Sequence, residues 1–118
     1  MKRDVRLYLD EIIESCLLLE KYLKGVTENF FFSSQEKQDV TVRRLEIIGE
    51  AAAQIPEEFK KQHPTVPWGK MKGIRNIIIH EYFGINYERI WETATQLIPP
   101  LKKQIEDLLE EVEKQYEK

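Results

Sequence analysis

Residues 4–29 read DVRLYLDEIIESCLLLEKYLKGVTEN, and the spacing of the apolar side chains in this stretch decides the fold class. Apolar residues recur there every three or four positions: Val5, Leu9, Ile12, Ile13, Cys16, Leu19, Leu23 and Val26. This period matches the helical repeat of about 3.6 residues and indicates an amphipathic helix with one face in a core. We therefore expect a helix from about Asp4 to Asn29, weakened near its end by Gly25.

A second and a short third segment follow from the capping and proline signals. Ser33 with Glu36 three residues later fits a capping box, so a helix should begin there and run to about Ile55. Small residues within it, Gly49 and the run 51–53, would permit close helix approach. Pro56 followed by two glutamates indicates a brief helical turn, and the prolines at 64 and 67 make residues 63–67 irregular.

The remainder of the chain predicts two more helices. One should run from about Trp68 to Tyr82 and end near Gly84. Asn86 can cap the next, which should extend through Val112 and bend at Pro99-Pro100, because each proline removes a backbone donor.

Length and composition fit a single domain over residues 1–118. The chain has 33% charged residues, five glycines and five prolines, and it shows no strand pattern or internal repeat. We expect an all-α, up-and-down bundle of four to five helices. At this size, pairing with a second copy would help to stabilise the fold.

The basic residues are unevenly placed, although the net charge is −3. Residues 59–80 contain no acidic side chain and five basic ones: Lys60, Lys61, Lys70, Lys72 and Arg75. Such a run is often only a solvated face, but a local positive field also draws a phosphate-bearing ligand. Within it, Lys70 and Lys72 are the predicted RNA contacts.

Other sequence features indicate the cellular compartment and the absence of a membrane span. The single cysteine, Cys16, lies in an apolar run and is read as a buried core residue in a reducing compartment. No stretch approaches the roughly 20 apolar residues of a membrane span, and no signal core is present, so we expect a cytoplasmic protein without a membrane partner. With two histidines and no CxxC pair, neither a metal site nor a cofactor is expected.

The chemistry-bearing residues gather in the helix expected over 68–82. Asn76 and His80 are four apart and share a face of a regular helix, with Arg75 displaced around the axis, so the three can border one pocket. Arginine offers a fixed fork of donors to phosphate, and the imidazole pKa near ~6.5 permits proton transfer in both directions. Asn76 can orient the imidazole or an RNA oxygen.

These groups suffice for RNA cleavage without a metal. A ribose 2'-hydroxyl must lose a proton, the leaving 5'-oxygen must gain one, and the phosphorane needs positive donors. DNA lacks that internal nucleophile, so RNA is the expected substrate, with His80 as general acid and base and Arg75 on the phosphate. On spacing alone, an ordinary surface pair is the commoner explanation.

The segment 75–82, RNIIIHEY, resembles the R-x4-H-x-Y signature of the HepT-like branch of HEPN ribonucleases, the toxins paired with minimal nucleotidyltransferase antitoxins. The blocks 44–52, 66–68 and 81–85, together with residues 90–91 and 97–99, also resemble that family in order and spacing. The resemblance covers about residues 40–105. After Trp68 the chain reads GKMKG, which departs from the basic and acidic pair frequent in the family and leaves antitoxin fit and substrate preference open.

The resemblance implies specific roles. Arg75 and His80 would be the catalytic pair and Asn76 a polar helper. Tyr82 would be the hydroxyl that the antitoxin modifies with AMP, and a bulky anion there would obstruct an RNA cleft. The resemblance also implies a HEPN-like homodimer in which two such motifs face one cleft.

Two other kinds of protein stay open. The chain could be a noncatalytic helical binding subunit that partners a minimal nucleotidyltransferase, or a purely structural bundle. Some residues also have ordinary explanations, namely pairing of Glu46 and Glu50 with Arg43 or Arg44, and core or interface packing of Trp68 and Trp91.

Overall fold

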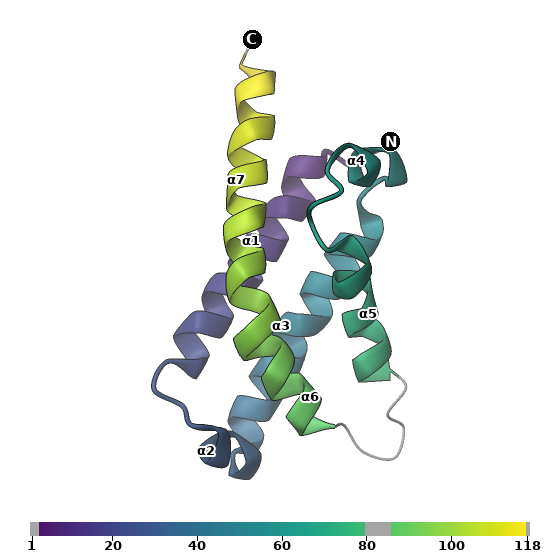
Figure 1. Ribbon diagram of the computed structural model, residues 1–118. Helices are drawn as coiled ribbons and strands as arrows, with labels where there is room; N and C mark the ends of the chain where they lie inside the picture. Colours follow the sequence, from purple (N-terminus) through teal and green to yellow (C-terminus); the bar gives the residue numbers. More distant parts are fainter. Residues whose placement is uncertain (1–2, 80–85, 118) are drawn as a thin grey trace.

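The computed structural model describes residues 3–79 and 86–117, which form helices joined by short connections (Figure 1). In chain order these are α1 (Val5–Leu23), α2 (Glu28–Ser33), α3 (Gln35–Gln54), α4 (Glu57–Gln62), α5 (Trp68–Ile79), α6 (Tyr87–Glu92), the π-helical turn η1 (Thr93–Leu97) and α7 (Ile98–Tyr116). No strand occurs in the described ranges. The all-α prediction is confirmed.

The long segments run alternately down and up the bundle in Figure 1, in the order α1, α3, α5 and the continuous run from α6 to α7. α3 contacts both α1 and α5, and α7 packs on α1. Counting α6 to α7 as one run, the described ranges hold six helical segments rather than the four to five expected. Among the helices of these ranges, none combines the length and the apolar character that a membrane span requires.

The extra segment arises where the first helix ends earlier than predicted. α1 stops at Leu23 instead of continuing to Asn29, because Gly25 adopts φ +74°, in the left-handed region that closes helices. Thr27 then caps a new helix, since its side-chain oxygen accepts a hydrogen bond from the Phe30 N–H at 3.1 Å. The apolar repeat alone does not reveal such a break between two helices.

The cap of α3 lies one residue beyond the predicted Ser33. The Ser34 hydroxyl accepts from the Lys37 N–H at 3.2 Å, whereas Ser33 is the last residue of α2. The buried Gln38 side chain donates to the carbonyl oxygens of Phe31 and Phe32, at 3.0 and 3.1 Å. These bonds satisfy carbonyls at the end of α2 and hold it on α3.

A contiguous core joins the long helices. The largest fully buried side chains are Leu9, Ile12, Leu19, Phe31, Leu45, Ile48, Met71, Ile74, Ile90, Ile98, Leu101 and Ile105. The Phe31 ring contacts Trp91 at a centroid distance of 5.1 Å and Tyr87 at 6.3 Å, which fixes α6 against α2.

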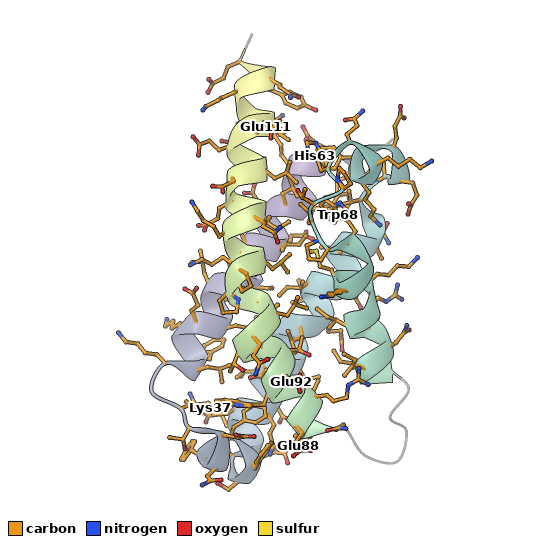
Figure 2. The ribbon with its side chains drawn as sticks, in the orientation of Figure 1. Lys37, His63, Trp68, Glu88, Glu92 and Glu111 are labelled. Carbon is orange, nitrogen blue, oxygen red and sulfur yellow. The ribbon has the colours of Figure 1, made fainter. Side chains whose placement is uncertain are left out.

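The run from α6 to α7, which was predicted to bend at Pro99-Pro100, contains a π-helical turn just before these prolines. As expected, Asn86 caps it by accepting from the Arg89 N–H at 3.2 Å. Pro99 and Pro100 cannot donate to the preceding turn, and the helix widens there into η1, where the Ile98 N–H bonds to the Thr93 carbonyl. The irregular stretch 63–67 is also confirmed. It is fixed by the Trp68 indole, which donates to the His63 carbonyl at 3.0 Å (Figure 2).

Candidate active site

Arg75 lies on the face of α5 that packs against α3, directly over a glycine. A Cβ built on Gly49 would stand 2.9 Å from the Arg75 Cγ and 3.3 Å from the Met71 carbonyl oxygen. No larger residue fits there without displacing α5, so Gly49 lets the arginine stem lie flat on α3. The close helix approach expected at Gly49 is thereby confirmed.

The Arg75 side chain is half-buried and borders a hollow of about 320 Å³ between α1, α3 and α5. Two carboxylates, Glu11 and Glu50, line the same hollow. Glu11 is already paired with Arg3 at 2.7 Å. Within residues 3–79 and 86–117, the Arg75 guanidinium makes no ion pair, although the Glu50 carboxylate lines the same hollow.

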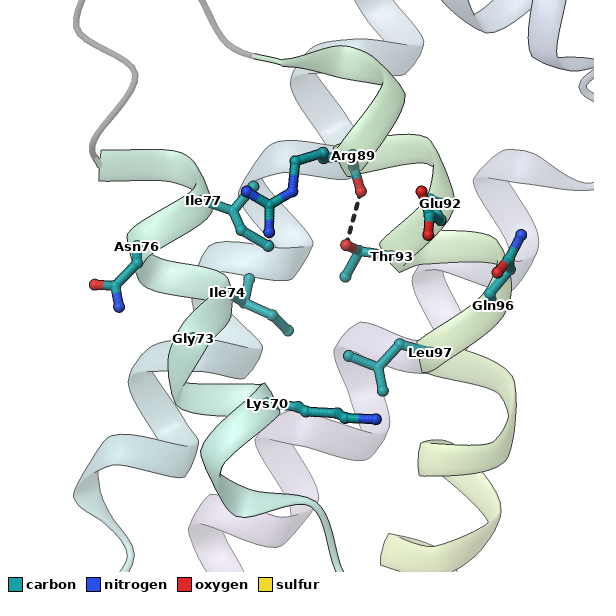
Figure 3. A pocket seen from close by; sticks show the side chains of 10 residues that line it. All are labelled: Lys70, Gly73, Ile74, Asn76, Ile77, Arg89, Glu92, Thr93, Gln96 and Leu97. Carbon is teal, nitrogen blue, oxygen red and sulfur yellow. Dashed lines mark hydrogen bonds between the residues drawn. The ribbon is translucent and has the colours of Figure 1, made fainter.

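Asn76 lines a different and larger groove. Successive residues of a helix differ by about 100° in direction, and Asn76 is exposed on a different side of α5 from Arg75. It lies at the edge of a groove of about 860 Å³ between α5 and the α6–η1 run, and Figure 3 shows its amide pointing away from the α6–η1 wall. Within one chain, Arg75 and Asn76 therefore open onto separate hollows rather than the single pocket expected.

The remaining residues of the predicted motif lie outside the described ranges. His80 and Tyr82 fall in the segment 80–85, between the last residue of α5 and Asn86. Their assignments as catalytic imidazole and modified hydroxyl stay predictions. The catalytic roles of Arg75 and Asn76 stay predictions as well.

The basic run is divided between structural and exposed positions. Lys60 is buried, with its ammonium 3.5 Å from Glu57, and so contributes little to a surface field. Lys70 and Lys72 are both exposed on α5. Lys70 lines the large groove, whereas Lys72, two residues further round the helix, does not. Of the two predicted RNA contacts, Lys70 is thus the one that lines this groove.

The residues of the opposite wall of this groove were not predicted from the sequence. Arg89 and Glu92 of α6, with Thr93 and Gln96 of η1, face α5 across it. These residues follow a helical spacing of three and four, and that polar stripe was the available signal. Because these residues lie outside the motif at 75–82, their spacing alone did not indicate that they face α5.

The ordinary explanations hold for several other residues. Glu46 pairs with Arg43 at 2.9 Å. The pairing predicted for Glu50 is not found, because within the described ranges Glu50 forms no ion pair with Arg43 or Arg44 and lines the Arg75 hollow instead. Trp68 is buried, and Trp91 is half-buried against Phe31, so both tryptophans serve the packing.

Cys16 is buried in the core, and this burial raises the pKa of its thiol to about 12. The thiolate is the reactive form, so the folded protein should resist alkylation by iodoacetamide at pH 8 and react fully in denaturant. Mass spectrometry of the alkylated protein measures this. Rapid labelling of the native chain would show that the α1 core opens readily.

Comparison with known proteins identifies the family. The family model described as ribonuclease HepT-like matches residues 12–108, which include the segment 75–82, the whole of α3 and α5, and parts of α1 and α7. The chain belongs to the HepT-like ribonuclease family. No solved structure matches it.

Curated relatives of this HepT-like chain carry ribonuclease names. A Thermococcus cleftensis protein named "Probable ribonuclease HepT" is 39% identical over 108 residues, which cover 92% of this chain and 98% of the relative. A "Putative RNase" of Caldanaerobacter subterraneus is 43% identical over 105 residues, covering 89% and 94%. A Methanocaldococcus jannaschii protein named "Gamma-glutamylcyclotransferase and putative RNase" is 42% identical over 114 residues. That match covers 97% of this chain, which spans only 51% of the relative.

Proposed function

We propose that the chain is a metal-independent endoribonuclease toxin of the cytoplasm that cleaves RNA by attack of the 2'-hydroxyl. The observation that carries the proposal is the match to the HepT-like ribonuclease family over residues 12–108. The names of the relatives agree with this activity. The placement of Arg75 supports it, because a half-buried guanidinium without an ion pair in the described ranges is suited to phosphate.

Each motif residue has one role in the proposed reaction. The His80 imidazole takes the proton of the 2'-hydroxyl as the 2'-oxygen attacks phosphorus. The P–O5' bond breaks, and the imidazolium returns the proton to the leaving 5'-oxygen. Arg75 donates to the non-bridging phosphate oxygens, whose charge grows in the phosphorane, and Asn76 orients the imidazole or an RNA oxygen.

A homodimer belongs to the proposal. Arg75 and Asn76 open onto separate hollows of one chain, so a cleft that combines them needs surface from elsewhere. A second copy would supply it with a second motif. Light scattering should give twice the mass of 14.1 kDa. A monomer that is fully active would remove the dimer from the proposal.

Cleavage by the purified chain tests the proposed function. The protein should cut RNA in the presence of a chelator and leave DNA of the same sequence intact, because DNA has no 2'-hydroxyl. A chain that cuts no RNA but forms a tight complex with a minimal nucleotidyltransferase would instead be the noncatalytic binding subunit.

The proposed control of the toxin acts at Tyr82. Co-expression with a neighbouring nucleotidyltransferase antitoxin should add the mass of AMP to this residue and abolish RNA cleavage, because the added phosphate competes for Arg75 and blocks the cleft. Peptide mass spectrometry locates the modification. Tyr82→Phe should stay unmodified and active in the presence of the antitoxin. A Tyr82→Phe chain that is silenced as fully as the wild type would refute this assignment.

A further inference from the structure

The groove between α5 and the α6–η1 run has the composition of a nucleotide site. Its volume of about 860 Å³ is in the range of pockets that hold a small organic ligand. The floor is apolar: Ile74 is buried, and Ile77 and Leu97 are half-buried. An apolar surface of this kind can take the face of a base, since every base has one.

Two basic side chains extend into the groove from opposite walls. Lys70 comes from α5 and Arg89 from α6, and Figure 3 shows the Arg89 side chain reaching toward Ile77 and the Lys70 side chain toward Leu97. In the described parts of the chain neither makes an ion pair. Both cations are therefore available to anionic groups on either side of a ligand that lies on the floor.

The polar groups between them limit which ligand fits. The Thr93 hydroxyl is already used, because it donates to the Arg89 carbonyl at 2.7 Å. Glu92 stands on the α6 side of the groove, away from the end of the Arg89 side chain in Figure 3. Arg89 also borders a smaller hollow lined by Glu28, Glu88 and Glu92. These carboxylates weaken the local positive field, so removing one should favour a polyanion.

We propose that this groove binds a nucleotide of single-stranded RNA next to the cleavage point, with Lys70 and Arg89 on its flanking phosphates and the base on Ile74, Ile77 and Leu97. The inference rests on the proposed function for its substrate. The groove and the predicted motif share one helix, because α5 carries Lys70, Ile74 and Ile77 of the groove as well as Arg75 and Asn76 of the motif. The groove therefore presents a cation on each side of an apolar floor. A nucleotide in single-stranded RNA likewise has a base and a phosphate on either side of its sugar.

Binding of an RNA that cannot be cut tests the groove separately from catalysis. A 2'-O-methyl RNA oligonucleotide is titrated by fluorescence anisotropy at several salt concentrations. Arg89→Ala should weaken binding about tenfold, the factor expected for one lost charge-assisted hydrogen bond. It should also lower the salt slope by about 0.7, the contribution of one phosphate contact in a single strand. Arg89→Lys should keep the slope and lose part of the affinity.

Two further variants sharpen the test. Glu92→Gln should tighten binding because it removes a negative charge from the groove wall. Lys114→Ala removes an exposed charge near the far end of α7, where Lys114 pairs with Glu110 at 3.4 Å, and should leave affinity and slope unchanged. Circular dichroism should show that the exposed Arg89 and Glu92 positions tolerate these changes.

The outcomes separate this inference from the proposed function. A wild-type chain that binds RNA through Arg89 but never cuts it would overturn the ribonuclease proposal and keep the groove. A wild-type chain that cuts RNA while Arg89→Ala binds with unchanged affinity and slope would overturn the groove and keep the ribonuclease. Absence of RNA binding by the wild type would also overturn the groove.

Discussion

We expect replacement of His80 with alanine to slow RNA cleavage by a factor of about 10² to 10⁴, the usual contribution of a general acid and base. The reason is that alanine can neither take the 2'-hydroxyl proton nor return one to the 5'-oxygen. Initial rates on a labelled RNA, measured in chelator, give the factor. His63→Ala is the matched control. The ring of this other histidine packs tilted against Phe59, with 4.6 Å between the ring centroids, and its loss should leave the rate unchanged.

Arg75→Ala should slow the same reaction by a factor of about 10² to 10³, since it removes donors from the developing negative charge. Arg75→Lys keeps the charge but loses the planar fork and should recover only part of the rate. Arg43→Ala, at an exposed arginine paired with Glu46, controls for loss of charge. A wild-type rate in either the His80 or the Arg75 alanine variant would contradict the mechanism.

Gly49→Ala should damage both stability and catalysis. The new methyl would meet the Arg75 Cγ at 2.9 Å and the Met71 carbonyl at 3.3 Å. Neither atom is the free end of a side chain, so α5 must move away from α3. We expect a loss of about 1–3 kcal/mol in the free energy of unfolding, which is typical of overpacking, together with a lower kcat because Arg75 is displaced. Urea unfolding and cleavage rates measure the two effects.

Gly69→Ala is the matched control for that substitution. Gly69 lies in the first turn of α5, and a Cβ built there meets nothing within 4 Å. Alanine should therefore keep the activity and leave stability equal or higher by up to roughly 1 kcal/mol, since it lowers the entropy lost on folding. Equal stability and activity in Gly49→Ala and Gly69→Ala would contradict the close packing of Arg75 on α3.

The fold was predictable where a local signal acts alone. The apolar period located the long helices, and Asn86 was correctly predicted as a cap because its side chain bonds within its own turn. The end of α1 was missed because Gly25 interrupts a stripe that otherwise continues through Val26. The cap of α3 was predicted one residue too early. Ser33 and Ser34 are both serines, and only the backbone conformation shows that Ser34 is the cap.

The candidate site was predictable only along one helix. The motif indicated Arg75 and Asn76 as site residues. It could not show that these two adjacent residues of α5 line different hollows. Gly49 contacts Arg75 across 26 positions of sequence, and Arg89 faces Lys70 from another helix. Such contacts depend on how α3, α5 and α6 pack, which periodicity does not determine.

The chemistry of the RNA ends after cleavage tests the central claim most directly. The account predicts that, in chelator, the purified chain leaves a 2',3'-cyclic phosphate on one fragment and a 5'-hydroxyl on the other, because the 2'-oxygen displaces the 5'-oxygen. Mass spectrometry of the fragments identifies both ends. Fragments with a 3'-hydroxyl and a 5'-phosphate, or no fragments without added metal, would contradict it.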